Sequence, residues 1–274
     1  MILDLTRQFL GNSTLGLFGA GHLGRAIAKG LLDVGLPRHN LAICHRGSQE
    51  TDHELAVAGL SELVADSKQV TQQSRILFYL VLPQDRLSIG DFNLSDDSLF
   101  VSFLAGVSLN NLPARIPNAQ RVRAMTSALD TLRQCNGIVA LYPTNTPLIR
   151  EILESLGLRI VALRQESDIH AFTALGPCLP VVLTYWDSLG YNIDDVELLE
   201  TARRFALPDY FPILQWAHRV RPKGLTGRER DRYRIQATTP GGVTDAILTA
   251  MKSGMSLPDA LSRGVERSHE LAAS

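Results

Sequence analysis

The sequence predicts an α/β protein, with an N-terminal Rossmann-like doubly wound sheet followed by an all-helical dimerisation domain. Two observations predict this architecture. Strand-like and helix-like segments alternate as far as Leu163, and beyond that point the long periodic segments are helical, with no convincing strand. The expected domains are therefore residues 1–163 and 164–274. The helices expected in the second domain cover residues 166–189, 195–206, 243–252 and 257–272.

A glycine-rich turn joins the first expected strand to the first helix. Residues 15–24 read L-G-L-F-G-A-G-H-L-G, so an apolar run leads into G-x-G-x-x-G at Gly19, Gly21 and Gly24. The first glycine permits a tight turn, the second lets backbone approach a pyrophosphate, and the third lets the helix sit close to the strand. The pattern predicts a bound dinucleotide at the helix N-terminus. A structural turn without ligand and a methyltransferase-type nucleotide loop are the alternatives.

The end of the second expected strand, residues 41–44, indicates which dinucleotide is bound. Enzymes that use NAD usually place a carboxylate there to hold the ribose 2′-hydroxyl. This chain has Cys44-His45-Arg46-Gly47-Ser48 instead, with no carboxylate before Glu50. Arginine and serine suit a 2′-phosphate, which favours NADP over NAD. The alternative is that Arg46 is simply a solvated loop residue.

The other elements of the first domain follow from apolar runs and helix boundary signals. Thr51-x-x-Glu54 predicts a capping box at the start of a short helix. Thr146-Pro147 opens a helix that ends at Gly157. The strands expected after the second are residues 76–81, 99–104, 121–125, 137–142 and 158–163.

Composition is that of an ordinary globular protein. The 274 residues are 45% hydrophobic and 20% charged, and a formal net charge of −1 gives no field that favours nucleic acid or an anionic membrane. Three cysteines, Cys44, Cys135 and Cys178, have no metal or redox spacing and no paired number for a disulfide framework. The longest apolar stretch is residues 76–82, too short to span a bilayer, and no signal peptide is evident. The expected location is the cytoplasm.

A second glycine segment precedes a late helix. Residues 238–244 read T-T-P-G-G-V-T, and Pro-Gly-Gly bends the chain so that its amides can converge on an anion such as a carboxylate. Thr244 falls in the first turn of the helix, where its hydroxyl can reach a ligand. The alternative is a plain helix start with Thr239 as N-cap and nothing bound.

The chain resembles the pyrroline-5-carboxylate reductase family over nearly its whole length. Thr239-Pro240-Gly241-Gly242-Val243-Thr244 matches the family hallmark, and the tail segments 257–261 and 267–271 resemble the family ending. Pro83-Gln84, Ala105-Gly106-Val107-Ser108 and Glu166-x-Asp168 resemble further landmarks. The resemblance implies an NADP-binding Rossmann domain and a homodimer or higher homo-oligomer formed through the helical domain.

The resemblance also implies a reaction and a set of residues. It implies NADPH-dependent reduction of 1-pyrroline-5-carboxylate to proline. Thr244 would hydrogen-bond the ring nitrogen, and the bend at Thr239, Gly241 and Gly242 would hold the substrate carboxylate. Catalysis would be mostly positioning, because a protonated cyclic imine is already an electrophile. The expected cofactor contacts are Gly19, Gly21, His22, Leu23, Gly24, Arg46, Ser48, Pro83 and Ala105.

Two segments depart from the family pattern. Residues 125–129 read M-T-S-A-L, without the asparagine and prolines that the family places beside the nicotinamide. Residues 173–178 read T-A-L-G-P-C, where the family has a longer run of small residues. The alternatives are therefore an NADP oxidoreductase of the same architecture acting on another imine or a keto or hydroxy acid, and a dinucleotide-binding protein without catalysis.

Other candidate features favour structural roles. Residues 219–234 are rich in Lys and Arg, which usually means a solvated face, and the segment lacks the repeated aromatic interleaving typical of nucleic-acid binding. His170 is the histidine to test as a proton donor, although a helix-surface role is expected. Tyr185 and Trp186 are expected in the core or at a dimer contact. No histidine or cysteine spacing indicates a metal site.

Overall fold

The structure is a computed structural model that describes residues 3–81, 94–112, 120–127, 136–207 and 209–273. The chain divides into two compact units. The first, residues 1–125 with 129–160, is called the Rossmann unit below, and the second, residues 126–128 with 161–274, is called the helical unit.

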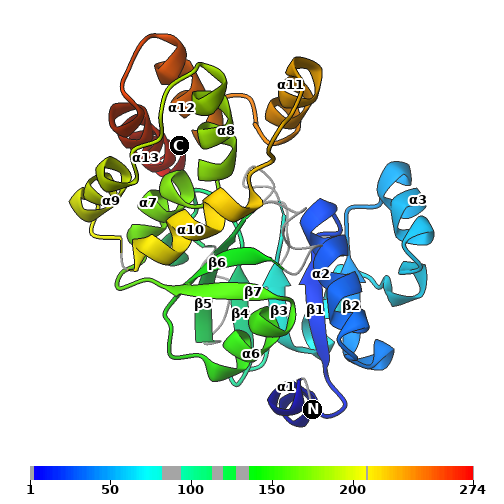
Figure 1. Cartoon of the computed structure of the whole chain (residues 1–274). Coiled ribbons are helices and arrows are strands. Elements are labelled where there is room, and N and C mark those ends of the chain that lie inside the picture. The colour runs from blue at the N-terminus through cyan, green and yellow to red at the C-terminus, as the bar shows by residue number, and fades with distance from the viewer. Residues whose placement is uncertain (1–2, 82–93, 113–119, 128–135, 208, 274) are drawn as a thin grey trace. The chain divides into compact units, whose positions relative to one another are not determined.

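A single seven-stranded sheet forms the centre of the Rossmann unit (Figure 1). Its spatial order is β2-β1-β3-β4-β5-β6-β7, and the pairs from β2 to β5 are parallel. The chain leaves β1 in one direction for β2 and returns to its other side for β3, so the crevice where ligands bind in such sheets lies at the carboxyl end of β1. The strands are β1 Thr14–Phe18, β2 Leu41–Cys44, β3 Ser74–Tyr79, β4 Leu99–Ser102, β5 Gln120–Thr126, β6 Gly137–Tyr142 and β7 Leu158–Ala162.

Helices cover both faces of this sheet. Alternate strand residues point to opposite faces, so the buried apolar side chains form two clusters. The cluster on one face includes side chains of α2 (His22–Asp33) and α6 (Pro147–Ser155), which stand in front of the strands in Figure 1. The cluster on the other face includes Val70 from α4 (Ser67–Gln73). The sheet is therefore doubly wound, and the predicted fold class is confirmed.

Local details of the Rossmann unit differ from the predictions at two helices. The predicted capping box at Thr51 is wrong, because α3 runs Gln49–Val57 and its N-cap is Ser48, whose side chain accepts from the Thr51 amide. A first helix, α1 Asp4–Leu10, was not expected. Helix α2 ends at Asp33 and is followed by Gly35, which has φ +94° and donates to the Leu32 carbonyl in a Schellman-type cap.

The described residues of the helical unit form seven α-helices. The segment expected as one helix over residues 166–189 is two helices, separated at residues 176–178, where Gly176 and Pro177 interrupt the pattern. Two helices, α10 and α11, were not expected. The seven are α7 Asp168–Leu175, α8 Leu179–Ser188, α9 Asp195–Arg204, α10 Tyr210–Val220, α11 Gly227–Gln236, α12 Val243–Lys252 and α13 Leu257–Ala273.

The segment Asp168–Ser188 has the length and composition of a membrane-crossing helix, with mean hydropathy 1.3 in its most apolar window. However, 72% of that window is buried inside the structure, as in the core helices of globular proteins. Its apolar side chains are therefore accounted for largely by packing within the chain.

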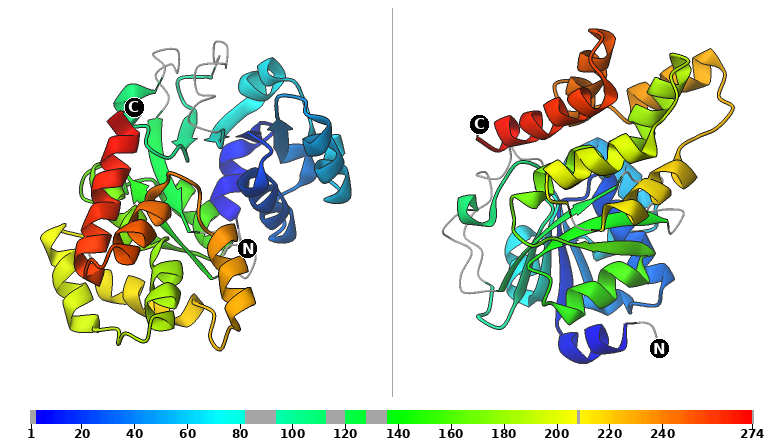
Figure 2. Two further views of the ribbon diagram at one scale, coloured as in Figure 1. Left: turned by 90° about the horizontal axis from the view of Figure 1, so that it is seen from above. Right: turned by 60° about the vertical axis from the view of Figure 1, so that its left-hand side comes forward.

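Helix α13 forms the packing centre of the helical unit. It runs beside α12 and also contacts α7 (Figure 2). The approach depends on Gly264 of α13, because a Cβ there would lie 2.4 Å from Cγ1 of Ile247 and 3.3 Å from Cβ of Ala174. This close packing holds α12 and α7 against α13.

Candidate functional site

The turn after β1 depends on glycine at its first and third glycine positions. Gly19 has φ +121°, and a Cβ there would lie 2.8 Å from the carbonyl of Leu80. A Cβ on Gly24 would lie 2.1 Å from the Gly19 carbonyl oxygen. The Gly19 amide donates to the Cys44 carbonyl at 2.9 Å, so the turn is tied to the end of β2. The backbone conformation and close packing of the turn therefore require glycine at both positions, whether or not a ligand binds.

Gly21 differs from its two neighbours in the motif. It is the N-cap of α2, with φ −64° and ψ −171°, a conformation open to any residue. In the part of the chain that the structure describes, a Cβ there would meet no heavy atom within 4 Å. Among the described residues, the amides of Gly21, His22 and Leu23 meet no acceptor. The arrangement leaves backbone donors and open space where a phosphate would approach.

The side chain of Arg25 stabilises the glycine turn after β1. Arg25 donates from Nη1 to the Ala20 carbonyl at 2.7 Å and forms an ion pair with Glu54 of α3. Its Nη2 lies 3.5 Å from Nδ1 of His22, which is exposed. The arginine therefore fixes the carbonyl side of the turn while the amide side stays open.

In the segment after β2, one predicted cofactor residue is exposed and the other caps a helix. The Gly47 amide donates to Nδ1 of His45 at 3.0 Å, and Nε2 of the same ring lies 3.2 Å from Asp52. Arg46 is exposed beside this arrangement. The Ser48 hydroxyl caps α3, since it accepts from the Thr51 amide at 3.1 Å and donates to the Thr51 hydroxyl at 2.7 Å. A structural role for Ser48 was thus missed from the sequence.

The remaining predicted cofactor residues lie farther along the same strand edge. Ala105 is exposed in the turn after β4, directly before Gly106 at φ +73°. Because β1 to β5 are parallel, this turn and the glycine turn share the carboxyl edge of the sheet. Pro83 lies outside the described residues, as do residues 128 and 129 of the departing segment 125–129.

The Pro-Gly-Gly bend in the helical unit is held by contacts within the chain. The Gly242 amide donates to the Thr239 carbonyl at 2.9 Å, and the Gly241 amide donates to Oδ2 of Asp245 at 2.9 Å. Nε of Arg267 in α13 donates to the Gly241 carbonyl at 2.9 Å. Thr239 is exposed and is not the N-cap of α12, which is Gly242. Both amides predicted to hold a carboxylate therefore have acceptors of their own.

Thr244 lies in the first turn of α12 and is buried, with 9% of its surface exposed. Its hydroxyl donates to Sγ of Cys178 at 3.2 Å. Burial raises the pKa of the Cys178 thiol to about 11, although the hydrogen bond from Thr244 lowers it in part, so the sulfur is neutral near pH 7. The lone pairs of the Thr244 oxygen remain available to a donor. Sequence reasoning missed this partner.

His170 is buried, contrary to the helix-surface role expected for it. Its Nδ1 lies 2.9 Å from the Ser268 hydroxyl, and its ring centroid lies 4.0 Å from that of His269. The neighbouring landmark Asp168 accepts from the amides of Arg164 and Gln165. These contacts fix α7 against α13 and hold its start.

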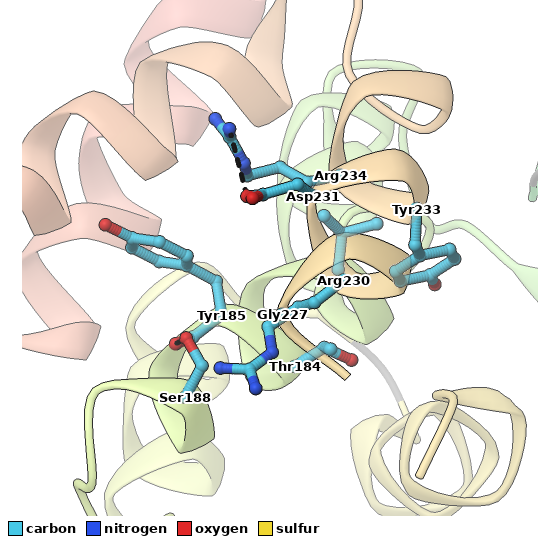
Figure 3. Close-up of a pocket in the computed structure, with 9 residues that line it drawn as sticks. Thr184, Tyr185, Ser188, Gly227, Arg230, Asp231, Tyr233 and Arg234 are labelled. Atoms are coloured by element: carbon cyan, nitrogen blue, oxygen red, sulfur yellow. Dashed lines mark hydrogen bonds and ion pairs between the residues drawn. The ribbon is translucent and has the colours of Figure 1, made fainter. Parts of the chain in front are cut away.

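A cleft of about 170 Å³ lies between α8 and α11 (Figure 3). Tyr185 and Ser188 line it from α8, and Arg230 and Tyr233 line it from α11. Helix α11 buries none of its residues, so the basic segment within it is a solvated face, as expected. Trp186 stacks on Tyr191 with ring centroids 4.5 Å apart.

Comparison with known proteins agrees with this geometry. Residues 14–106, which contain the glycine turn, match the family model described as NADP oxidoreductase coenzyme F420-dependent. A curated relative, pyrroline-5-carboxylate reductase of Pasteurella multocida (strain Pm70), is 29% identical over 171 residues. That match covers 57% of this chain and 60% of the relative, so the chain matches less than two thirds of the relative's length.

Solved structures share the fold over nearly the whole chain. A pyrroline-5-carboxylate reductase from Coxiella burnetii has a TM-score of 0.61 at 18% identity, and the match covers 96% of this chain and 100% of that one. A pyrroline carboxylate reductase from Plasmodium falciparum, with NADP bound, has a TM-score of 0.57 at 16% identity over 95% and 98% of the two chains. This chain is therefore similar to an NADP oxidoreductase family over residues 14–106, and it shares its fold with solved pyrroline-5-carboxylate reductases over nearly its whole length.

Proposed function

We propose that this chain is an NADP-dependent oxidoreductase that reduces a small cyclic imine, with 1-pyrroline-5-carboxylate as the reference substrate and proline as its product. The observation that carries the proposal is the open glycine turn at Gly21, where three amides meet no acceptor among the described residues. The names of the curated relative and of the structures that share the fold supply the reaction class.

The turn after β1 fits the pyrophosphate of a dinucleotide. Space for a ligand atom exists at Gly21, where a Cβ would otherwise project, and the first turn of α2 supplies the donors. Arg46, exposed after β2, is the side chain proposed for the 2′-phosphate, by charge pairing. Ser48 already caps α3, so Arg46 carries most of the proposed preference for NADP over NAD.

Thr244 is proposed to orient the imine. Bound NADPH supplies a hydride to the carbon of the C=N bond, and the electron pair of the double bond moves to nitrogen, which becomes an amine. Because the Thr244 hydroxyl donates to Cys178, its oxygen is free to accept a hydrogen bond from a protonated imine nitrogen. This polarity favours a ring N–H group over a carbonyl oxygen, which needs a donor.

NADPH oxidation in the presence of 1-pyrroline-5-carboxylate tests the proposal. Thr244→Ala is expected to lower kcat/KM by about 10-fold to 100-fold, since it removes one hydrogen bond to a charged group. Thr249→Ala, on an exposed face of the same helix, is the matched control and should leave kcat/KM unchanged. Equal kcat/KM in wild type and Thr244→Ala would contradict the assignment.

A second candidate function is an oxidoreductase of the same architecture that acts on another imine or on a keto or hydroxy acid. The observation that favours it is the bond between the Gly241 amide and Asp245, because this amide is one of those predicted to hold the substrate carboxylate. A panel of small imines and 2-oxo acids with NADPH distinguishes the two. A dinucleotide-binding protein without catalysis would turn over no member of the panel.

We also propose that the helical unit mediates self-association. Most of the large apolar side chains exposed in the described residues belong to it, including Tyr191, Val196, Phe211 and Ile235. Burying such side chains between subunits is favourable, and twofold oligomers are the commonest. Light scattering on the purified chain should give at least twice the 30.1 kDa of one subunit, and a monomer at micromolar concentration would contradict the proposal.

A further inference from the structure

A carboxylate of the chain itself occupies the Pro-Gly-Gly bend. Asp245 is the third residue of α12, and its Oδ2 accepts from the Gly241 amide at 2.9 Å. Gly241 has φ +71°, a backbone conformation that points this amide back toward the helix start. The second glycine amide of the bend, that of Gly242, donates to the Thr239 carbonyl. Asp245 therefore stands where an acid group of a ligand would accept from Gly241.

The positive charge near the Pro-Gly-Gly bend is already paired with a carboxylate of the chain. Arg267 donates from Nε to the Gly241 carbonyl, and its Nη1 donates to Glu270 at 2.9 Å. Its charge is thus paired within α13. The negative charge of Asp245 already uses the favourable potential of the α12 N-terminus. A substrate carboxylate would meet a like charge at the bend and would have to displace it.

A helix cap by itself would also explain the contact. An acidic side chain at the third helical position commonly reaches back to a backbone amide before the helix. A cap affects helix stability whatever the substrate, whereas competition for the Gly241 amide affects only ligands that bring a carboxylate. The two explanations therefore predict different results for ligand pairs that differ only in that group.

We propose that Asp245 is a specificity-determining residue that makes this site favour small cyclic imines without a carboxylate beside the ring nitrogen. The inference rests on the proposed function, because it concerns the same bend and the same class of imine. The amides of Val243 and Thr244, which meet no acceptor among the described residues, remain for any polar group of the ligand. The expected preferred substrate is therefore 1-pyrroline rather than 1-pyrroline-5-carboxylate.

The test compares two imines and their two products on three proteins: wild type, Asp245→Asn and Asp245→Ala. Turnover of 1-pyrroline and 1-pyrroline-5-carboxylate is measured with NADPH, and binding of pyrrolidine and L-proline is measured calorimetrically with NADP present. Asp245→Ala should lower KM for 1-pyrroline-5-carboxylate and Kd for L-proline by about tenfold, and KM and Kd for the uncarboxylated pair should stay within about twofold. Asp245→Asn, which keeps a neutral acceptor, should give a smaller gain.

Asp259→Asn is the matched control, because Asp259 also caps a helix start, through Ser256 at the beginning of α13. Asp259→Asn should change neither the ratio of the KM values of the two imines nor the ratio of the Kd values of the two products. Equal shifts for both members of each pair, or no gain for L-proline in Asp245→Ala, would overturn the role of Asp245. Absence of turnover of either imine by wild type, with the binding pattern intact, would overturn the proposed function and leave the role of Asp245 supported.

Discussion

The chain contains two glycine-bearing helix starts, and their structures differ in one decisive respect. Both α2 and α12 begin after a glycine N-cap without a side-chain cap, at Gly21 and Gly242. Before α2, the amides of Gly21, His22 and Leu23 meet no acceptor among the described residues. Before α12, the bend amides are bonded to Asp245 and to the Thr239 carbonyl. The bend before α2 thus leaves its amides to a ligand, whereas both glycine amides of the bend before α12 are bonded within the chain.

The difference shows how a glycine can be assigned to the fold or to a ligand. Gly19, Gly24 and Gly242 lie where a Cβ would come within 3 Å of backbone atoms, so the fold explains them. Gly241 needs its positive φ. Gly21 alone among these five combines ordinary dihedral angles with a Cβ position that no described residue approaches within 4 Å, so the described residues give no reason for glycine there. A phosphate that must approach the protein backbone closely would be a sufficient reason for glycine at this position.

The largest expected effect comes from the glycine that the fold requires. Gly24→Ala should lower the free energy of unfolding by about 2–4 kcal/mol, because its Cβ would lie 2.1 Å from a backbone oxygen that has little room to move. Urea denaturation measures this. The matched control is Gly30→Ala in the same helix, where the Cβ would meet a flexible Leu156 methyl and the loss should be smaller. Equal stabilities of Gly24→Ala and wild type would contradict the packing.

A second prediction concerns the buried thiol under the α12 start. The folded-state pKa of Cys178 is raised to about 11 from 9.0, chiefly by burial, so its contribution to stability is fully present below pH 9 and is lost as pH rises toward 11. In Cys178→Val, the fall in unfolding free energy between pH 9 and 11 should be smaller by about 2 kcal/mol. If denaturant titrations gave the same fall in unfolding free energy between pH 9 and 11 for wild type and Cys178→Val, the thiol would not be shielded from solvent.

The smallest expected effect concerns the arginine that holds the bend. Hydrogen bonds from Arg263 and then Arg267 lower the pKa of Glu270 to about 2, so the stability that this carboxylate contributes is present above pH 4.5 and is lost as pH falls toward 2. Arg267→Gln should move the acid-unfolding midpoint slightly upward. Arg234→Gln, which removes an exposed pair on α11, should not move it. A lower pH midpoint of acid unfolding for Arg267→Gln would contradict a stabilising contact between Arg267 and Glu270.

Much of the fold was readable from the sequence because its signals are local. The bounds of β2, β6 and α12 agree with the apolar runs and breakers that predicted them. Helix α11 was missed because it buries none of its residues and so has no apolar stripe, although its capping box at Thr226 and Glu229 was a readable signal. Helix α10 was also missed, and it carries Pro212 in its first turn, where a proline is tolerated because the amide there has no intrahelical acceptor.

The candidate site was predictable only where one segment suffices. The glycine turn is contained in six consecutive residues, so its geometry follows from the motif. The contact between Thr244 and Cys178 joins residues 66 positions apart and depends on how α12 packs on α8. The Arg267 contact with Gly241 depends likewise on α13 packing beside α12. Periodicity and spacing do not specify such long-range pairs, whereas the Asp245 contact, four residues long, was within reach of capping rules.

Titration of Gly21→Ala with NADPH tests the central claim most directly. Alanine fits the dihedral angles of Gly21 and would meet no atom of the described residues within 4 Å, so the unfolding free energy should stay within about 1 kcal/mol of wild type. The Kd for NADPH, followed by nucleotide fluorescence, should rise about tenfold or more, because the new methyl fills the space for the pyrophosphate. Gly227→Ala, another uncrowded glycine, should leave Kd unchanged. An unaltered Kd in Gly21→Ala would contradict the account.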